Sequence, residues 1–142
     1  MVLTGCAAFA SAESPRTLRG VVPRTSTVVV AEEGQFEPRS TGSYSVRVYG
    51  GTNARFPYDD FIAGAVRPRD GAIVSLVFGD VTGGKTPEIV VVIRSAGTGG
   101  YLSADAFHLD GNTLSLVESV AGLAKDADPV HALRAKHANE RR

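Results

Sequence analysis

The sequence Ile89-Val90-Val91-Val92-Ile93 is an uninterrupted run of five aliphatic residues. β-Branched side chains favour strands, and a strand without a polar face cannot lie against water on either side. Turn-forming residues bound the run, with Pro87 before it and Gly97 after it. The run therefore predicts a central strand that is covered on both faces.

Other segments on either side of this run have the composition or the alternation of strands. The clearest alternation is in Ser43–Tyr49, where Tyr44, Val46 and Val48 are separated by polar residues, as in a strand with one buried face. The turn sequence Asp110-Gly111-Asn112 would join two strands as a hairpin. These segments are Thr25–Ala31, Ser43–Tyr49, Phe61–Val66, Ala72–Phe78, Tyr101–Leu109 and Leu114–Val117.

One helix is expected near the carboxyl terminus. Asp128-Pro129 has the pattern of an N-cap followed by proline at the first helical position. Val130, Leu133 and Ala135 would give that short helix one apolar face. The predicted fold class is therefore mainly β, an antiparallel sandwich or meander of about seven or eight strands with one short C-terminal helix.

Composition narrows the possible functions. The chain has 142 residues, the size of one domain, and its 43% hydrophobic and 21% charged residues are typical of a folded protein. Fifteen basic residues match fifteen acidic ones, and this zero net charge disfavours a general nucleic-acid-binding protein. The one cysteine excludes an internal disulfide. No apolar run is long enough to cross a bilayer, so we expect no membrane span.

The amino-terminal segment is interpreted as an export signal. Residues 1–12 are apolar, uncharged and rich in small side chains, and they end in Ala10-Ser11-Ala12, a pattern that signal peptidase accepts. The preceding Leu3-Thr4-Gly5-Cys6 is similar to a bacterial lipobox, in which Cys6 would carry lipid instead. Both interpretations place the protein outside the cytoplasm, in the periplasm or anchored in a membrane facing it. Residues 13–24 are assigned to a leader and residues 25–142 to a single domain.

Residues that could support catalysis are poorly arranged for it. Asp59 and Asp60 are neighbours, so on an extended chain they point to opposite faces and cannot easily share a proton. His131 and His137 are six positions apart, whereas metal ligands on one helix face need a spacing of three or four. We interpret these two residues and His108 as surface histidines. No enzyme activity and no cofactor are expected.

The segment from Asp80 to Val90 is similar to the calcium-binding loops of integrin-like propeller repeats. Asp80, Thr82 and Glu88 supply oxygen ligands of the kind that calcium prefers. Gly84, however, stands where such loops have a central carboxylate, and Lys85 adds positive charge. A structural turn is therefore the favoured interpretation, and a weak calcium site is the alternative.

The segment from Arg94 to Tyr101 is the most informative for function. Three glycines, Gly97, Gly99 and Gly100, surround Thr98, and Tyr101 follows them directly. Glycines remove side-chain bulk, so such a loop can enter a narrow cleft. Hydroxyl groups can hydrogen-bond carboxyl groups in another protein, and tyrosine is a frequent interface anchor. The alternative is a tight hairpin loop with Tyr101 in the core.

Most of the chain, from about Thr41 to Lys136, resembles the periplasmic inhibitors of invertebrate-type lysozyme. The stretches that carry this resemblance are Phe56-Pro57-Tyr58-Asp59-Asp60-Phe61, Arg67-Pro68-Arg69-Asp70-Gly71, Pro87 to Ser95, Gly99 to Asp105 and Leu123 to Pro129.

The resemblance implies a binding mode and a site. In that family a Ser-Gly-x-Tyr loop enters the active-site cleft of the lysozyme. The matching residues here are Thr98, Gly99, Gly100 and Tyr101, so threonine replaces the expected serine. The flanking Gly97, Ser95 and Arg94 would belong to the same lysozyme-binding site.

The family also implies a homodimer, and an invertebrate-type lysozyme is the expected partner. Two other functions remain open from the residues alone. One is a calcium- or carbohydrate-binding β module of the cell envelope that uses the Asp80–Glu88 loop. The other is a structural envelope protein with no soluble target.

Overall fold

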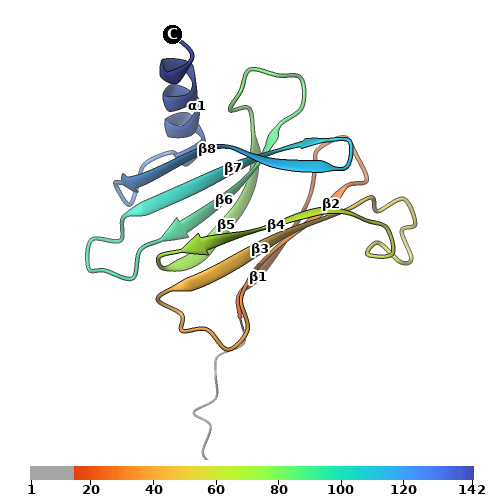
Figure 1. Ribbon diagram of the computed structural model, residues 1–142, viewed down its shortest axis with the longest axis horizontal. Coiled ribbons are helices and arrows are strands. Elements are labelled where there is room, and N and C mark those ends of the chain that lie inside the picture. Colours follow the sequence, from red (N-terminus) through yellow and green to blue (C-terminus); the bar gives the residue numbers. More distant parts are fainter. Residues whose placement is uncertain (1–14) are drawn as a thin grey trace, which may run out of the picture.

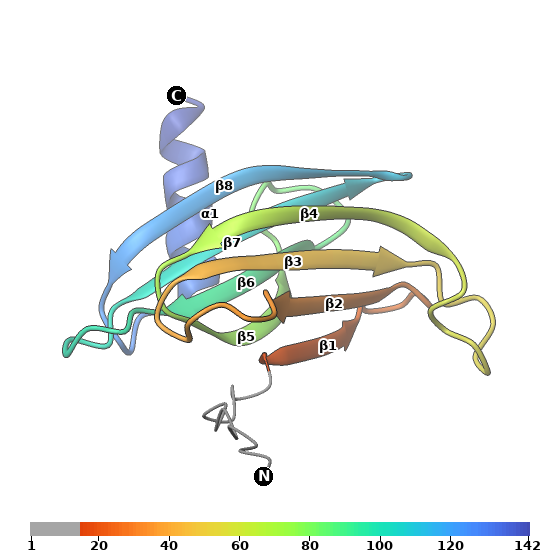
Figure 2. The same ribbon diagram turned by 60° about the horizontal axis from the view of Figure 1, so that its bottom comes forward.

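The computed structural model describes residues 15–142 as two four-stranded antiparallel sheets that face each other, with one helix packed outside (Figures 1 and 2). The first sheet consists of β1 (Thr17–Val21), β2 (Val28–Glu33), β3 (Gly42–Tyr49) and β4 (Phe61–Arg69). The second consists of β5 (Ala72–Gly79), β6 (Glu88–Arg94), β7 (Leu102–Asp110) and β8 (Thr113–Leu123). Helix α1 (Pro129–Glu140) follows.

Each sheet is a meander, because every strand pairs with its neighbour in the sequence. The turn between β4 and β5 carries the chain from one sheet to the other. The predicted fold class, an antiparallel sandwich with one C-terminal helix, is confirmed.

Strand β6 lies at the centre of the core, as its sequence predicts. Ile89, Val91 and Ile93 face the first sheet and pack in the core between the two sheets. Val90 and Val92 face the other way, toward a second cluster that includes Leu133 of α1. Both faces are therefore covered, and burial of each such side chain stabilises the fold by roughly 1.5–3 kcal/mol.

The alternation on β3 and the helix cap are also confirmed. Tyr44, Val46 and Val48 are fully buried, while the residues between them are partly exposed. The Asp128 carboxylate accepts hydrogen bonds from the backbone N–H groups of Val130 and His131, at 3.1 and 3.3 Å, and Pro129 begins the helix.

The leader assignment differs from the structure at residues 17–21. This segment forms the edge strand β1, which pairs with β2 from Thr17↔Glu32 to Val21↔Val28. β1 has only five residues, and two of them are Arg19 and Gly20, so its strand character comes from the partner strand and not from its own pattern. The domain therefore begins before residue 25. The predicted export signal and Cys6 lie outside the described residues.

Strand β4 extends three residues beyond the predicted segment Phe61–Val66 and includes Pro68. It is an edge strand that pairs only with β3 within its sheet. At an edge, a missing backbone N–H can face solvent, so proline is tolerated. Within residues 15–142 no helix combines the length and apolarity that a membrane crossing would require.

Candidate lysozyme-binding loop

Residues 95–101, the β6–β7 loop, project from one end of the sandwich. The β4–β5 turn and the β2–β3 loop lie at the same end (Figures 1 and 2). This position follows from the meander, since alternate connections emerge at the same end of the strands. The loop that the sequence marks by its glycines therefore extends from the most buried strand of the molecule, β6.

Hydrogen bonds at its base give the loop a defined shape. The Ser95 N–H donates to the Tyr101 carbonyl at 2.8 Å and closes the loop. Arg94 Nη1 donates to the Gly100 carbonyl at 3.0 Å. The Gly97 N–H donates to Ser95 Oγ at 3.2 Å. The first two of these bonds join the start of the loop to its end.

The three glycines of the loop have different roles. A Cβ at Gly99 would lie 2.3 Å from Cε2 of Tyr101, so the tyrosine ring rests directly on the Gly99 backbone. Gly100 has φ +60°, a conformation that disfavours other residues. A Cβ at Gly97, in contrast, would lie no closer than 3.6 Å to Ser95 Oγ, within ordinary contact distance. Gly99 and Gly100 are therefore required by the geometry, and Gly97 is not.

Thr98 and Tyr101 are both on the surface. The Tyr101 side chain is 56% exposed, whereas the next residue, Leu102, is buried. The interpretation of Tyr101 as a core residue is therefore wrong. The loop exposes the phenol side chain of Tyr101 and the hydroxyl-bearing side chain of Thr98, which suits binding to a polar cleft in another protein.

A buried arginine fixes the neighbouring loops. Arg69 is 3% exposed, and its guanidinium donates to the carbonyls of Pro38, Arg39, Ser43 and Gly71 at 2.7–2.9 Å. These bonds tie the β2–β3 loop to the β4–β5 turn. The end of the molecule that carries the β6–β7 loop is therefore braced by hydrogen bonds within and around it.

The β4–β5 turn also abuts β6. A Cβ at Gly71 would lie 2.0 Å from the Arg94 carbonyl oxygen, so the backbone of this turn lies directly against the last residue of β6. Glu37 in the β2–β3 loop accepts hydrogen bonds from the backbone and side chain of Ser43. These bonds hold the pKa of the Glu37 carboxyl below its usual value.

In the Asp80–Glu88 loop, the glutamate binds to other residues of the same loop. Glu88 is fully buried, and its Oε1 accepts the N–H groups of Val81 and Thr82 at 2.9 and 3.1 Å and the Thr82 hydroxyl at 3.2 Å. Its Oε2 lies 2.9 Å from Nδ1 of His108. Burial opposes ionisation, but these hydrogen bonds outweigh it and lower the pKa of Glu88.

Asp80, another candidate ligand in that loop, also has an internal partner. Asp80 Oδ1 accepts the Gly83 N–H at 2.7 Å. Throughout residues 15–142, no cluster of three or more His, Cys, Asp or Glu side chains could hold a metal ion. The calcium alternative therefore has no support in the geometry, and the interpretation as a structural turn is favoured.

The two helix histidines and the Asp59–Asp60 pair lie in separate parts of the structure. His137 Nδ1 is 3.5 Å from Glu118 Oε2, while His131 is exposed on the same helix. Asp59 and Asp60 are exposed in the β3–β4 loop, at the other end of the molecule from the β6–β7 loop. The carboxylate beside His137 is therefore Glu118, and neither helix histidine pairs with Asp59 or Asp60.

Sequence reasoning missed a feature of the β2–β3 loop. Phe36 is 96% exposed there and has φ +66°, which is unusual for a residue with a side chain. The signal was present in the sequence, because this phenylalanine stands among turn residues between Gly34 and Pro38, with no apolar neighbour.

Comparisons with known proteins agree with the resemblance. The family described as periplasmic lysozyme inhibitor of I-type lysozyme matches residues 17–137. The crystal structure of PliI-Ah, such an inhibitor from Aeromonas hydrophila, is 48% identical, with a TM-score of 0.76 over 83% of this chain and 98% of that one.

A second similar structure is Aeromonas hydrophila PliI in complex with Meretrix lusoria lysozyme. It is also 48% identical, with a TM-score of 0.76 over 84% of this chain and 95% of that one. A search of curated protein sequences found no match. Because the family match spans β1 to α1, the chain belongs to the family of periplasmic inhibitors of I-type (invertebrate-type) lysozyme.

Proposed function

We propose that this chain inhibits I-type lysozyme by inserting the β6–β7 loop into the active-site cleft of the enzyme. The observation that carries the proposal is the geometry of that loop. Thr98 and Tyr101 are exposed, and hydrogen bonds from Ser95 and Arg94 hold the base of the loop.

The chemistry of the target explains why hydroxyl groups suffice. Lysozymes cleave a glycosidic bond between two carboxyl groups. A threonine hydroxyl and a phenol can each donate to one carboxyl oxygen or accept from a protonated carboxyl, so both protonation states are satisfied. Thr98 and Tyr101 would therefore occupy the place of the sugar without reacting, and the inhibitor acts by binding and not by catalysis.

The cleft walls also favour a glycine-rich loop. Gly99 and Gly100 present backbone where side chains would meet the walls. Tyr101 supplies most of the apolar area of the tip. Truncation of a buried interface anchor of this kind costs about 1–3 kcal/mol of binding free energy.

Steady-state kinetics with an I-type lysozyme test the mode of inhibition. An inhibitor in the cleft competes with substrate, so it should raise the apparent KM for a soluble chitin oligomer and leave kcat unchanged. Chicken-type and goose-type lysozymes, assayed in parallel, report selectivity. Inhibition that lowers kcat and leaves KM unchanged would place the loop outside the cleft and refute the proposal.

The family is described as periplasmic, and in that compartment the inhibitor would protect peptidoglycan from a host lysozyme. We propose export through the amino-terminal signal, with lipid at Cys6 as the alternative to cleavage after Ala12. We also propose a homodimer, as the resemblance implies. Sedimentation velocity at micromolar concentration tests it, since a monomer at all concentrations would contradict it.

A further inference from the structure

The outer face of the first sheet carries an open groove that the proposed function does not use. Helix α1 packs on the second sheet, against β7 and β8, so within residues 15–142 no helix covers the first sheet (Figures 1 and 2). The groove lies over β3 and β4 and has a volume of about 600 Å³, a size typical of ligand sites. It is lined by Ser45, Val46, Arg47, Phe61, Gly64, Ala65 and Val66.

The β4 side of this groove is apolar and contains an exposed aromatic ring. Phe61 is 58% exposed and Val66 is 71% exposed. A Cβ at Gly64 would lie 3.5 Å from Cζ of Phe61, so the ring lies against a backbone position that has no side chain. The ring of Tyr49 meets that of Phe61 edge-on, with centroids 5.9 Å apart. The Phe61 ring is therefore held in place while much of its surface stays open to solvent.

The β3 side of the groove is polar but has no net charge. Ser45 and Arg47 pair with Val66 and Gly64 of β4. Arg47 Nη2 lies 3.5 Å from Glu32 Oε1, and this carboxylate balances the charge of the guanidinium. Apart from that pair, the Arg47 side chain has no polar partner within residues 15–142, and its Nε is buried without an acceptor. A ligand that brings a neutral acceptor to this guanidinium would satisfy donors that are otherwise unused.

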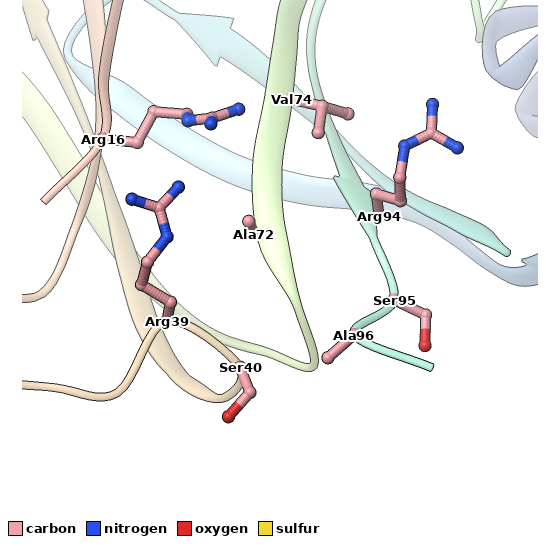
Figure 3. Close-up of a pocket in the computed structure, with 8 residues that line it drawn as sticks. All are labelled: Arg16, Arg39, Ser40, Ala72, Val74, Arg94, Ser95 and Ala96. Carbon is pink, nitrogen blue, oxygen red and sulfur yellow. The ribbon is translucent and has the colours of Figure 1, made fainter. Parts of the chain in front are cut away.

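The hollow beside the β6–β7 loop has a different chemical character (Figure 3). Its volume is about 440 Å³. The residues that line it within 15–142 include three arginines and no aromatic ring: Arg16, Arg39, Ser40, Ala72, Val74, Arg94, Ser95 and Ala96. The groove on the first sheet, in contrast, combines an exposed ring with polar groups that carry no net charge. It therefore suits a neutral ligand with one apolar face.

A pyranose sugar has a surface that is divided in the same way. Its C–H groups form an apolar face that packs on an aromatic ring, and the hydroxyl groups at its rim bond to polar side chains. An acetamido substituent adds a carbonyl oxygen, which is a good acceptor for a guanidinium. A phosphate or another anion would gain less here, because Glu32 already balances the charge of Arg47.

A second copy of the chain fits this face less well than a sugar does. Stable protein interfaces bury roughly 800 Å² on each partner, and charged residues are depleted at their cores. Arg47 lies between Val30 of β2 and Gly64 of β4 in one row across the sheet. An ion-paired arginine would thus stand in the middle of such an interface, whereas a ligand of a few sugar rings needs only the groove.

We propose that this groove binds an N-acetylated glycan chain, with one sugar ring packed on Phe61 and an acetamido carbonyl bonded to Arg47. The groove lies on the face of the first sheet, away from the Asp80–Glu88 loop and from the tip of the β6–β7 loop, so glycan binding does not depend on the proposed function. Peptidoglycan belongs to this class of polymer. The inhibitor would therefore be retained on the material that lysozymes attack.

The first test uses the unmodified inhibitor and two tetrasaccharides that have the same linkage. Tetra-N-acetylchitotetraose carries an acetamido group on every ring, and cellotetraose carries a hydroxyl group at those positions. Binding is followed by NMR titration. We expect chitotetraose to shift the backbone amides of residues 45–47 and 61–66 most strongly, and to bind at least about fivefold more tightly than cellotetraose, because only it supplies the carbonyl acceptor.

The second test removes the ring and includes a matched control. Phe61→Ala is expected to weaken chitotetraose binding by about 5- to 10-fold, whereas Phe61→Tyr, which keeps a ring, should stay within about twofold of wild type. Phe36→Ala is the control, because it also removes an exposed phenylalanine, but from the β2–β3 loop at one end of the sandwich. It should bind chitotetraose as wild type does. Melting temperatures of the same samples identify a folding defect, and the titration of the unmodified chain is independent of it.

Several outcomes would overturn glycan binding at this groove. They are the absence of shifts at about 10 mM chitotetraose, shifts centred outside residues 45–47 and 61–66, equal binding of both tetrasaccharides, and equal losses in Phe61→Ala and Phe36→Ala. Sedimentation velocity and lysozyme binding are measured on Phe61→Ala as well. If this variant dissociates a dimer or loses affinity for lysozyme, while it binds chitotetraose as wild type does, the face binds a protein and the glycan site is refuted. Failure of wild type to inhibit lysozyme, with the chitotetraose shifts intact, would refute the proposed function alone.

Discussion

Replacement of Tyr101 by alanine should weaken inhibition by about 10- to 100-fold. The side chain is 56% exposed in the free protein, so about half of a tyrosine surface of roughly 200 Å² is available for burial in a cleft. At about 25 cal/mol per Å² this area corresponds to about 2.8 kcal/mol, and ordering of the ring on binding reduces it. A net loss of about 1.4–2.8 kcal/mol of binding free energy lowers the affinity by about 10- to 100-fold.

The assay is inhibition of an I-type lysozyme on bacterial cell walls, with the melting temperature measured on the same samples. Tyr58→Ala is the matched control, because Tyr58 is 48% exposed and lies in the β3–β4 loop at the other end of the sandwich. Tyr101→Ala should keep its melting temperature within a few degrees of wild type, since the ring has few core contacts to lose. A variant that unfolds, while each folded molecule inhibits as well as wild type, would refute the reasoning.

Three further outcomes are expected. Gly99→Ala should displace the Tyr101 ring and weaken inhibition at least as much as loss of the ring, while Gly97→Ala should stay within about twofold, both measured by cell-wall lysis. The lowered pKa of Glu88 stabilises the fold above pH about 4.5, and this contribution is lost as pH falls through the folded-state pKa, so urea unfolding of Glu88→Gln should show a smaller loss on acidification than wild type. Cys6→Ser should release the protein from membranes if Cys6 carries lipid, and fractionation that is unchanged and entirely soluble in both forms would exclude the anchor.

Some features of the fold could be predicted from sequence because their cause is local. The covered strand β6 and the half-buried strand β3 follow from apolar patterns that any chain segment carries in itself. Strand β1 could not be predicted in this way. Its five residues include a glycine and an arginine, and only pairing with β2 and close packing of Gly20 on Phe78 make it a strand.

The same distinction applies to the candidate site. The β6–β7 loop was predictable, because three glycines and a tyrosine mark it within eight consecutive residues. The contacts of Arg69 were not, because its partners are backbone carbonyls of the β2–β3 loop and the β4–β5 turn, which the sequence does not reveal.

A contact as small as this loop can inhibit a lysozyme only if the loop is already ordered before it binds. Residues 95–101 number seven, and ordering a flexible backbone on binding costs about 1–2 kcal/mol per residue. The proposed anchors Thr98 and Tyr101 would supply about 1–3 kcal/mol each, which is less than the cost of ordering the whole loop. The hydrogen bonds from Ser95 and Arg94, and the tyrosine ring resting on Gly99, therefore have to exist before the enzyme arrives. On this reasoning, the proposed glycine-rich loop can inhibit effectively only if the end of the sandwich has already folded it.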